Sequence, residues 1–188
     1  IIQSSLNKRK CEEIKEVIDT LKSGWITTGP KTKLFENRIG DFCRTRKAVC
    51  LNSATACMET TLRILGVGPG DEVITTAYTY TATASVVCHV GARLILVDTA
   101  PDSYQMDYDK LEAAVTERTK VIIPVELGGV ICDYDRLFDI VEKKRELFSP
   151  SNEIQEKIGR VIFNLKMAFV GKTFFEKMCF PHTPFQKF

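Results

Sequence analysis

Between residues 54 and 125, short apolar runs alternate with segments of helical periodicity, and this alternation limits the possible folds more than any other feature of the chain. Helices and strands are expected in turn, at 54–65, 72–75, 82–90, 93–97, 110–116 and 121–125. The expected strands are apolar at successive positions, as strands covered on both faces are. The pattern predicts an α/β fold with a mainly parallel sheet sandwiched by helices.

The segments on either side of this region have patterns of their own. We expect amphipathic helices at 6–21 and 34–42, a charged helix at 134–147, strands at 47–51 and 160–163, and a turn at 149–152. Residues 163–188 lose all periodicity and hold most of the chain's 11 phenylalanines, with Glu176 as the one acidic residue. This change in composition predicts a boundary near residue 163, followed by an aberrant tail. A genuine aromatic docking tail is the alternative.

Charge and cysteine content exclude several classes of protein. The chain has 26 basic and 24 acidic residues, spread without long runs of one sign, so we expect neither nucleic acid nor a membrane as partner. Its seven cysteines are an odd number and include no C-x-x-C pair, which argues against a disulfide framework or a zinc site and favours a reduced, cytoplasmic location. The apolar runs are too short to cross a bilayer. The chain lacks an initiator methionine, so we expect it to begin inside a longer reading frame.

The segment Asn52-Ser53-Ala54-Thr55-Ala56 lies between an expected strand and an expected helix. Small residues at a helix N-terminus let a phosphate approach the unpaired amides, and Ser or Thr hydroxyls add donors. The alternative is that Asn52 or Ser53 simply caps the helix. No G-x-G-x-x-G or G-x-x-x-x-G-K-[ST] motif occurs, so a phosphate ligand here would not belong to the usual nucleotide classes.

A second candidate segment, residues 75–81, combines four threonines with Tyr78 and Tyr80 after an expected strand. Ligands of open α/β sheets bind beyond the carboxyl ends of the strands, so this loop and the small-residue turn are expected to face one crevice. One of the two rings could stack on a flat cofactor. The alternative is that both rings pack as half-buried loop aromatics.

Several segments together resemble one family, in order as well as in spacing. They are WITTGP at 25–30, LNSATA at 51–56, GVGPGDEVIT at 66–75, GA at 91–92 with VD at 97–98, and RTK at 118–120 with IIPV at 122–125. Over residues 6–162 the chain resembles the DegT/StrS sugar aminotransferases. The resemblance implies the large domain of a fold type I pyridoxal-phosphate (PLP) transferase, incomplete here, with 1–162 as its N-terminal part and 163–188 as a non-family tail.

The resemblance also implies roles for particular residues. Thr55 and Ala56, with Ser53 and Ala54 beside them, would hold the cofactor phosphate, and Tyr80 would stack on the pyridine ring. A further group would line the substrate site or meet a partner subunit: Trp25, Thr27 and Tyr78.

The family's reaction is transfer of an amino group from an amino acid, commonly glutamate, to a nucleotide-linked keto-sugar, by homodimers that serve polysaccharide and other nucleotide-sugar pathways. Glu126-Leu127-Gly128-Gly129 departs from the commoner His-containing version, so the resemblance does not indicate which sugar is used.

After Ile162 the chain departs from the family pattern. The aspartate motif that pairs with the ring nitrogen and the later motif with the Schiff-base lysine are both missing, so we assign no catalytic residue and expect a frameshift near residue 163. The chain alone is expected to bind PLP weakly or not at all and to catalyse nothing. The alternatives are a catalytically dead binding or regulatory relative of the family, and a general nucleotide-binding α/β module.

Overall fold

A computed structural model describes residues 2–158, with side chains described from residue 12 onward. The expected strand at 160–163 and the tail at 163–188 lie outside the described residues. The described residues divide into two compact units, which meet between residues 50 and 51, and each unit is described by itself. Within residues 2–158, no helix is both long enough and apolar enough to cross a bilayer.

The first unit consists of two helices, α1 (Ile2–Ser23) and α2 (Pro30–Phe42), as the apolar periodicity predicts. Gly24 follows α1 in the left-handed region, at φ +72°, where glycine is preferred. Pro30 begins α2, a position at which its missing N–H costs nothing. An ion pair between Lys31 and Glu16 links the two helices.

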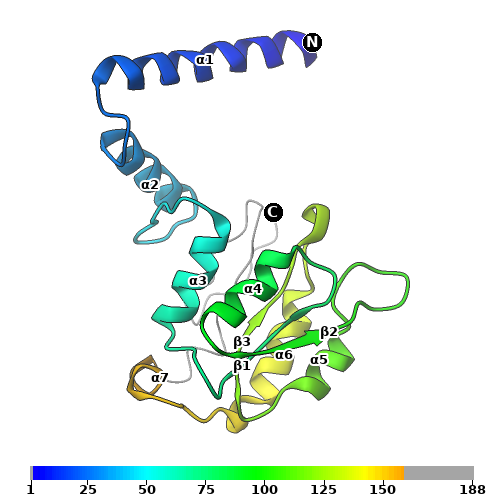
Figure 1. The fold of residues 1–188 in the computed structure, drawn as a ribbon. Coiled ribbons are helices and arrows are strands. Elements are labelled where there is room, and N and C mark those ends of the chain that lie inside the picture. The colour runs from blue at the N-terminus through cyan, green and yellow to red at the C-terminus, as the bar shows by residue number, and fades with distance from the viewer. Residues whose placement is uncertain (1, 159–188) are drawn as a thin grey trace. The chain divides into compact units, whose positions relative to one another are not determined.

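The second unit contains a sheet of three parallel strands, β1 (Glu72–Thr76), β2 (Arg93–Val97) and β3 (Thr119–Ile123). Their order is β2-β1-β3, and Ile74 of β1 lies opposite Ile95 and Ile122. All five residues of β1 and all five of β3 are buried. The parallel sheet predicted from the apolar runs is confirmed (Figure 1).

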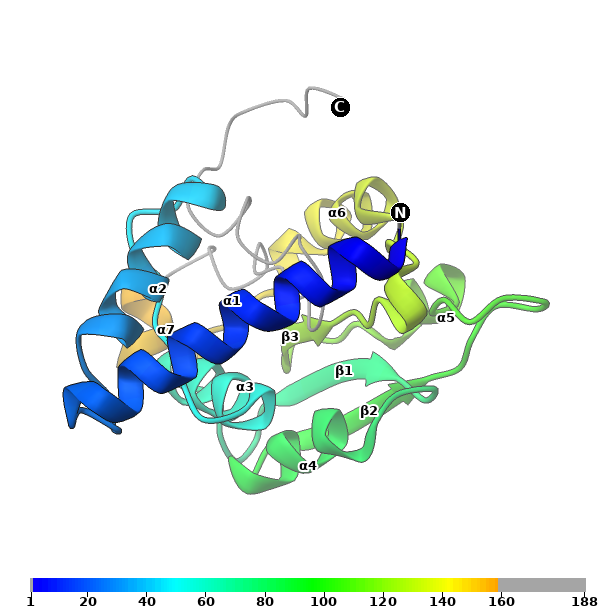
Figure 2. The ribbon, with the colours of Figure 1, turned by 90° about the horizontal axis from the view of Figure 1, so that it is seen from above.

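Helices cover both faces of this sheet (Figure 2). On one face, α3 (Ala54–Ile64) and α4 (Thr81–His89) enclose a core with Val73 at its centre. On the other, α5 (Tyr108–Ala114) and α6 (Tyr134–Lys143) enclose a second core around Ile74. Adjacent residues of β1 therefore supply opposite cores, as the alternation of side chains along a strand requires.

The strand predicted at 47–51 is wrong. These residues form no strand, and Val49 and Leu51 are exposed. The Cys50 amide donates instead to the Glu36 carboxylate, at 2.9 Å. An apolar run becomes a strand only if a neighbouring strand pairs with its backbone, and none does so in the part of the chain that the structure describes.

The segment after α6 contains two elements that the sequence did not predict separately. The expected helix at 134–147 ends at Lys143 and is followed by a 3₁₀ turn, η2 (Arg145–Leu147). A short helix, α7 (Glu153–Ile158), then follows the expected turn at 149–152. A second 3₁₀ turn, η1 (Leu127–Gly129), lies between β3 and α6.

Buried polar contacts fasten α7 to the loop before β1. The Gln155 amide is fully buried and donates to the Gly66 carbonyl at 3.0 Å and to the Asp71 carboxylate at 2.9 Å. Asn152 donates to the same carbonyl at 2.7 Å. Gly66 has φ +67°, and a Cβ there would lie 2.7 Å from the Asn152 side chain, so glycine is required on both grounds.

A buried carboxylate joins the amino ends of the strands. Glu72, whose side chain is 2% exposed, accepts hydrogen bonds from Thr116 at 2.6 Å and Arg118 at 3.1 Å, and pairs with Arg93 at 3.3 Å. Burial alone would raise the pKa of Glu72, but the bonds from Thr116 and Arg118 hold this pKa below its usual value. Glu72 therefore stays charged although it is buried, and its contacts link the amino ends of the three strands.

Candidate functional site

The small-residue turn and the tyrosine loop both lie at the carboxyl edge of the sheet. Seven residues separate α3 from β1, and four residues separate β1 from α4. The C-terminal half of α3 contacts His89, the last residue of α4, so the two helices lie side by side and run in the same direction. Eleven helical residues and five strand residues each span about 16 Å. The N-terminus of α3 is therefore level with the carboxyl end of β1, where α4 also begins.

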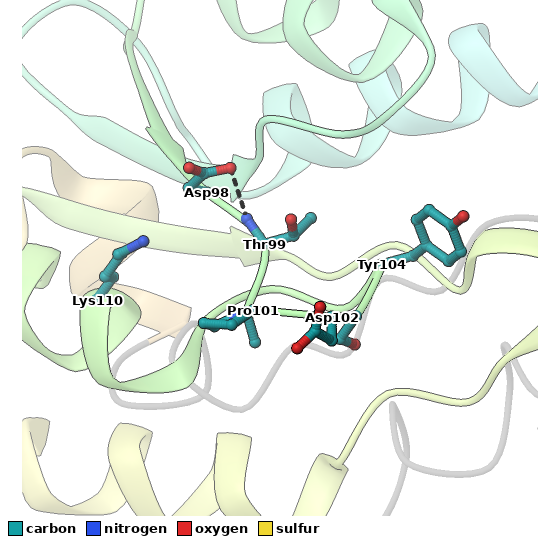
Figure 3. Close-up of a pocket in the computed structure, with 8 residues that line it drawn as sticks. Asp98, Thr99, Pro101, Asp102, Tyr104 and Lys110 are labelled. Atoms are coloured by element: carbon teal, nitrogen blue, oxygen red, sulfur yellow. Dashed lines mark hydrogen bonds between the residues drawn. The ribbon is translucent and has the colours of Figure 1, made fainter.

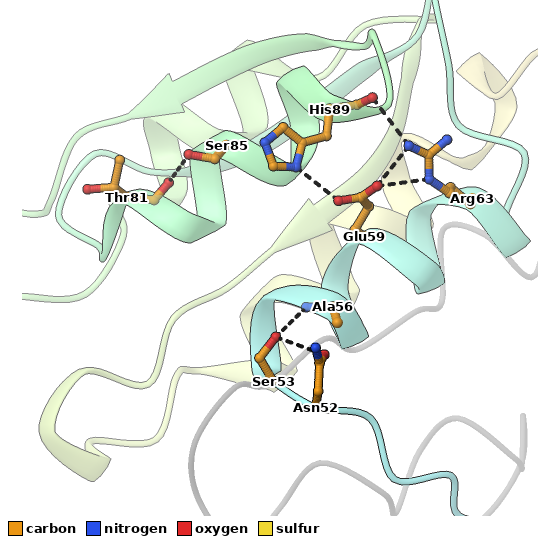
Figure 4. Close-up of polar contacts among 8 residues, drawn as sticks. All are labelled: Asn52, Ser53, Ala56, Glu59, Arg63, Thr81, Ser85 and His89. Atoms are coloured by element: carbon orange, nitrogen blue, oxygen red, sulfur yellow. Dashed lines mark hydrogen bonds and ion pairs between the residues drawn. The ribbon is translucent and has the colours of Figure 1, made fainter.

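Ser53 caps α3. Its backbone is extended, and its hydroxyl accepts a hydrogen bond from the Ala56 amide at 3.1 Å (Figure 4). Ser53 therefore caps the helix, and a cap of this kind is compatible with a phosphate site. The amides of Ala54 and Thr55 belong to the same first turn, where N–H groups have no acceptor within the helix. Ala54 is exposed, and Thr55 and Ala56 are partly exposed.

Tyr80 is the N-cap residue of α4 and is 82% exposed. The alternative of a half-buried ring therefore does not hold for Tyr80. The Tyr78 ring stacks on the Tyr104 ring, with 5.5 Å between centroids and an interplanar angle of 23°. Tyr104 lies in the loop after β2 and was not singled out from the sequence.

A surface hollow of about 610 Å³ opens at the carboxyl end of β2. Residues 98–104 and Lys110 line it, and the sequence analysis missed it (Figure 3). The Asp98 carboxylate accepts from the Thr99 amide at 2.8 Å, and Lys110 pairs with Asp107 at 3.4 Å. The Val97-Asp98 pair, which was used above as a family motif, would have been the signal for this place.

Glu126 occupies the carboxyl edge after β3. It is 5% exposed, and its carboxylate accepts from the Tyr134 hydroxyl at 3.0 Å. Burial, then the hydrogen bond to Glu126, raises the pKa of Tyr134, so this phenol stays protonated. Burial also raises the pKa of the neighbouring Cys132 thiol to about 11, which makes it a poor nucleophile.

Trp25 and Thr27 lie in the first unit, apart in sequence from the other candidate residues. The Trp25 indole donates to the Thr28 carbonyl at 2.9 Å and folds over Gly29, where a Cβ would overlap the ring. The structure thus groups Ser53, Thr55 and Tyr80 with Tyr78 in the second unit. Trp25 and Thr27 lie in the first unit, in the loop between α1 and α2.

Polar contacts tie the C-terminal halves of α3 and α4 together (Figure 4). Glu59 accepts from Arg63 at 2.7 Å and contacts His89 Nδ1 at 2.9 Å, while Arg63 reaches the His89 carbonyl. These contacts fix the two helices side by side at the ends opposite their N-termini. The hydrogen bond from Arg63, followed by that with His89, lowers the pKa of Glu59.

We expect Glu59→Gln to destabilise the chain at neutral pH and to lose this effect in acid. A carboxyl whose folded pKa lies below its unfolded value contributes stability above the unfolded pKa, and this contribution disappears as the pH falls through the folded pKa. The difference between wild type and variant should therefore narrow below pH 4.5. Urea unfolding across this range measures it, with Glu156→Gln, an exposed carboxylate on α7, as control. A difference that does not change with pH would contradict the assignment.

Comparison with known proteins identifies the family. Residues 7–147 match the model of the DegT/DnrJ/EryC1/StrS aminotransferase family. The chain belongs to this family. The recognition made from the sequence motifs is confirmed, and the parallel sheet flanked by helices is that of fold type I aminotransferases.

Among curated relatives of the family, the chain is 44% identical over 131 residues to the spore coat polysaccharide biosynthesis protein SpsC of Bacillus subtilis, covering 70% of this chain and 34% of that protein. It is 43% identical over 132 residues to the UDP-4-amino-4-deoxy-L-arabinose–oxoglutarate aminotransferase of Shewanella sediminis, with 70% and 34% covered.

Among solved structures, Spr1654 of Streptococcus pneumoniae, assigned as a sugar aminotransferase, superposes with a TM-score of 0.73 at 62% identity, covering 77% of this chain and 36% of that one. Spr1654 is known in a PLP form and a pyridoxamine-phosphate form. The chain spans about a third of the length of each of these three relatives.

The residues at the head of α3 have the chemistry that a phosphate group requires. Backbone amides, two hydroxyl side chains and the positive end of the helix dipole meet there, and no acidic side chain lies in the first turn. The family's cofactor, PLP, carries such a phosphate.

Proposed function

We propose that this chain forms the phosphate- and ring-binding part of a PLP-dependent sugar aminotransferase. The observation that carries the proposal is the placement of Ser53–Ala56 and Tyr80 at the N-termini of two parallel neighbouring helices on one edge of the sheet. PLP is proposed as the ligand of this site because the chain belongs to the aminotransferase family.

Each of these residues has a distinct task in the proposed site. The Ala54 and Thr55 amides and the Thr55 hydroxyl donate to the phosphate, and Ser53 keeps the turn open by capping Ala56. The exposed ring of Tyr80 offers an aromatic face to the pyridine ring. When bound, PLP supplies the electron sink for amino transfer.

The relatives support a proposal for the substrates of the whole protein. We assign glutamate as amino donor and a nucleotide-linked keto-sugar as acceptor, supported by the name of the Shewanella relative, an oxoglutarate aminotransferase that acts on a UDP-linked amino sugar. Tyr78, together with Trp25 and Thr27, would contact the substrate, in an active site completed by a second copy of the chain. The chain on its own is proposed to be inactive, because no aspartate occurs after residue 163 and no lysine is assigned to the cofactor.

A titration of the isotope-labelled chain with PLP tests the proposal. We expect the backbone amide signals of Ala54, Thr55 and Ala56 to shift on addition of PLP and of inorganic phosphate, with weak, saturable binding. Pyridoxal, which lacks the phosphate, should leave these three signals in place.

Two outcomes would contradict the proposal. If PLP moved none of the three amides, the phosphate site would be wrong. If a stable covalent bond between PLP and one particular lysine of this chain remained after free PLP was removed, the expectation that no lysine of the chain holds the cofactor would be wrong.

A further inference from the structure

The loop that carries Tyr80 is held at its start by the sheet. The Ala77 amide donates to the Val97 carbonyl at 2.8 Å and so extends the pairing of β1 with β2 by one residue. Beyond it, the Tyr78 amide donates to the Thr76 hydroxyl at 3.3 Å, and the Thr79 and Thr83 hydroxyls are 2.9 Å apart. Both contacts are local, because they join the loop to the end of β1 and to α4. Among the described residues, the stack of Tyr78 on Tyr104 is the side-chain contact that ties this loop to a different segment.

Tyr104 is itself well anchored. Its loop is closed by an antiparallel bridge between Thr99 and Met106, and the Ala100 amide donates to the Gln105 carbonyl at 2.9 Å. The side chain of Gln105 donates to the Ile131 carbonyl at 2.9 Å. Tyr104 therefore offers Tyr78 a fixed surface, although its own ring is 67% exposed.

We propose that Tyr104 is a positioning residue for the ring-binding side of the site. By stacking on Tyr78 it holds the loop that leads into α4, and so fixes where the Tyr80 ring stands relative to the phosphate turn of α3. Tyr104 does not touch the cofactor in this proposal. The inference takes PLP as its ligand from the proposed function and rests on it in that respect. The stack and its effect on the loop do not depend on the ligand.

The size of the effect follows from the energetics of aromatic pairs. A stacked pair changes an equilibrium by about 2- to 10-fold beyond the area that it buries. The opening equilibrium of the Tyr78–Tyr80 loop, and the affinity for a ligand that needs Tyr80 in place, should change by factors in this range. Binding of inorganic phosphate, which needs only the turn of α3, should not change.

Tyr104→Ala, with Tyr104→Phe as its matched control, separates these effects. In the absence of any ligand, Tyr104→Ala should speed amide hydrogen exchange at Ala77 and Tyr78, the loop amides that are hydrogen-bonded, by about 2- to 10-fold. Tyr104→Phe should leave the exchange at these two amides unchanged. With ligands, Tyr104→Ala should weaken PLP binding by a similar factor while phosphate binding stays as in wild type, and Tyr104→Phe should bind both normally. The substituted ring is exposed, so the fold is expected to survive, and circular dichroism checks this.

The outcomes distinguish the two proposals. Unchanged exchange in Tyr104→Ala would overturn the inference, as would unchanged PLP affinity in a wild-type chain that binds PLP. If the wild-type chain bound neither PLP nor phosphate, the proposed function would fail, and the exchange measurement would still decide whether Tyr104 fixes the loop.

Discussion

Thr55→Asp is expected to abolish measurable binding of phosphate and PLP while leaving α3 intact. Thr55 is the second residue of α3, within its first turn. An aspartate there meets the positive end of the helix dipole, so the helix keeps or gains stability. The same carboxylate stands where the phosphate would lie, and two like charges about 5 Å apart cost enough to reduce affinity by about 30-fold or more.

Thr55→Asn is the control, because asparagine has the same shape as aspartate without the charge. It should bind phosphate within a few-fold of wild type, so the comparison isolates electrostatic repulsion from the loss of the threonine hydroxyl. The amide titration described above provides the measurement, and helix content is followed by circular dichroism. If Thr55→Asp bound PLP as wild type does, the phosphate would not lie at the head of α3.

Leu62→Ala should cause the largest loss of stability among simple core substitutions of α3. The Leu62 side chain is fully buried, in the core with Val73 and Val86 between α3, α4 and the sheet. Removing it is expected to lower the free energy of unfolding by about 2–5 kcal/mol, because a cavity remains where the side chain was. Since small domains are stable by about 5–15 kcal/mol, a large part of the total would be lost.

The same helix supplies a matched control. Ile64 is 65% exposed, and Ile64→Ala removes an apolar side chain of the same volume class, with an expected change within about 0.5 kcal/mol. Urea unfolding of both variants beside wild type makes the comparison. Equal losses would mean that α3 does not pack on the sheet through Leu62.

The strands and the helices that cover them could be predicted because their signal is local. Val121 to Ile123 is apolar at successive positions, and a run of this kind is stable only with cover on both faces. Residues 47–51 show where this argument fails. Their β-propensity can be seen in the sequence, but a strand also needs a partner strand, and the partner comes from elsewhere in the chain. The Cys50 amide donates to the Glu36 carboxylate of α2 and not to a neighbouring strand.

Buried polar residues could not be predicted from the sequence for the same reason. Gln155 and Glu72 look like surface residues in a sequence, yet both are buried, because their partners come from distant parts of the chain. Burial of a polar group is tolerated when its hydrogen bonds are made, and no local pattern shows where those bonds will form.

The candidate site was predictable in part. The turn at Ser53 has a local signature of small and hydroxyl residues before a helix, and the structure confirms the cap on Ala56. Tyr104 has no such signature, because its importance comes from Tyr78, which precedes it by a whole helix and strand. The binding roles of Ser53–Ala56, Tyr80, Trp25, Thr27 and Tyr78 stay predictions.

The two edges of the sheet differ in a way that bears on how such proteins diversify. The ion pairs of Glu72 and the amide contacts of Gln155 gather at the amino edge, whereas the tyrosine stack, the hollow and Glu126 gather at the carboxyl edge. Substitutions in the carboxyl-edge loops therefore leave the buried contacts of Glu72 and Gln155 in place, so the sequence of these loops can change without loss of the fold.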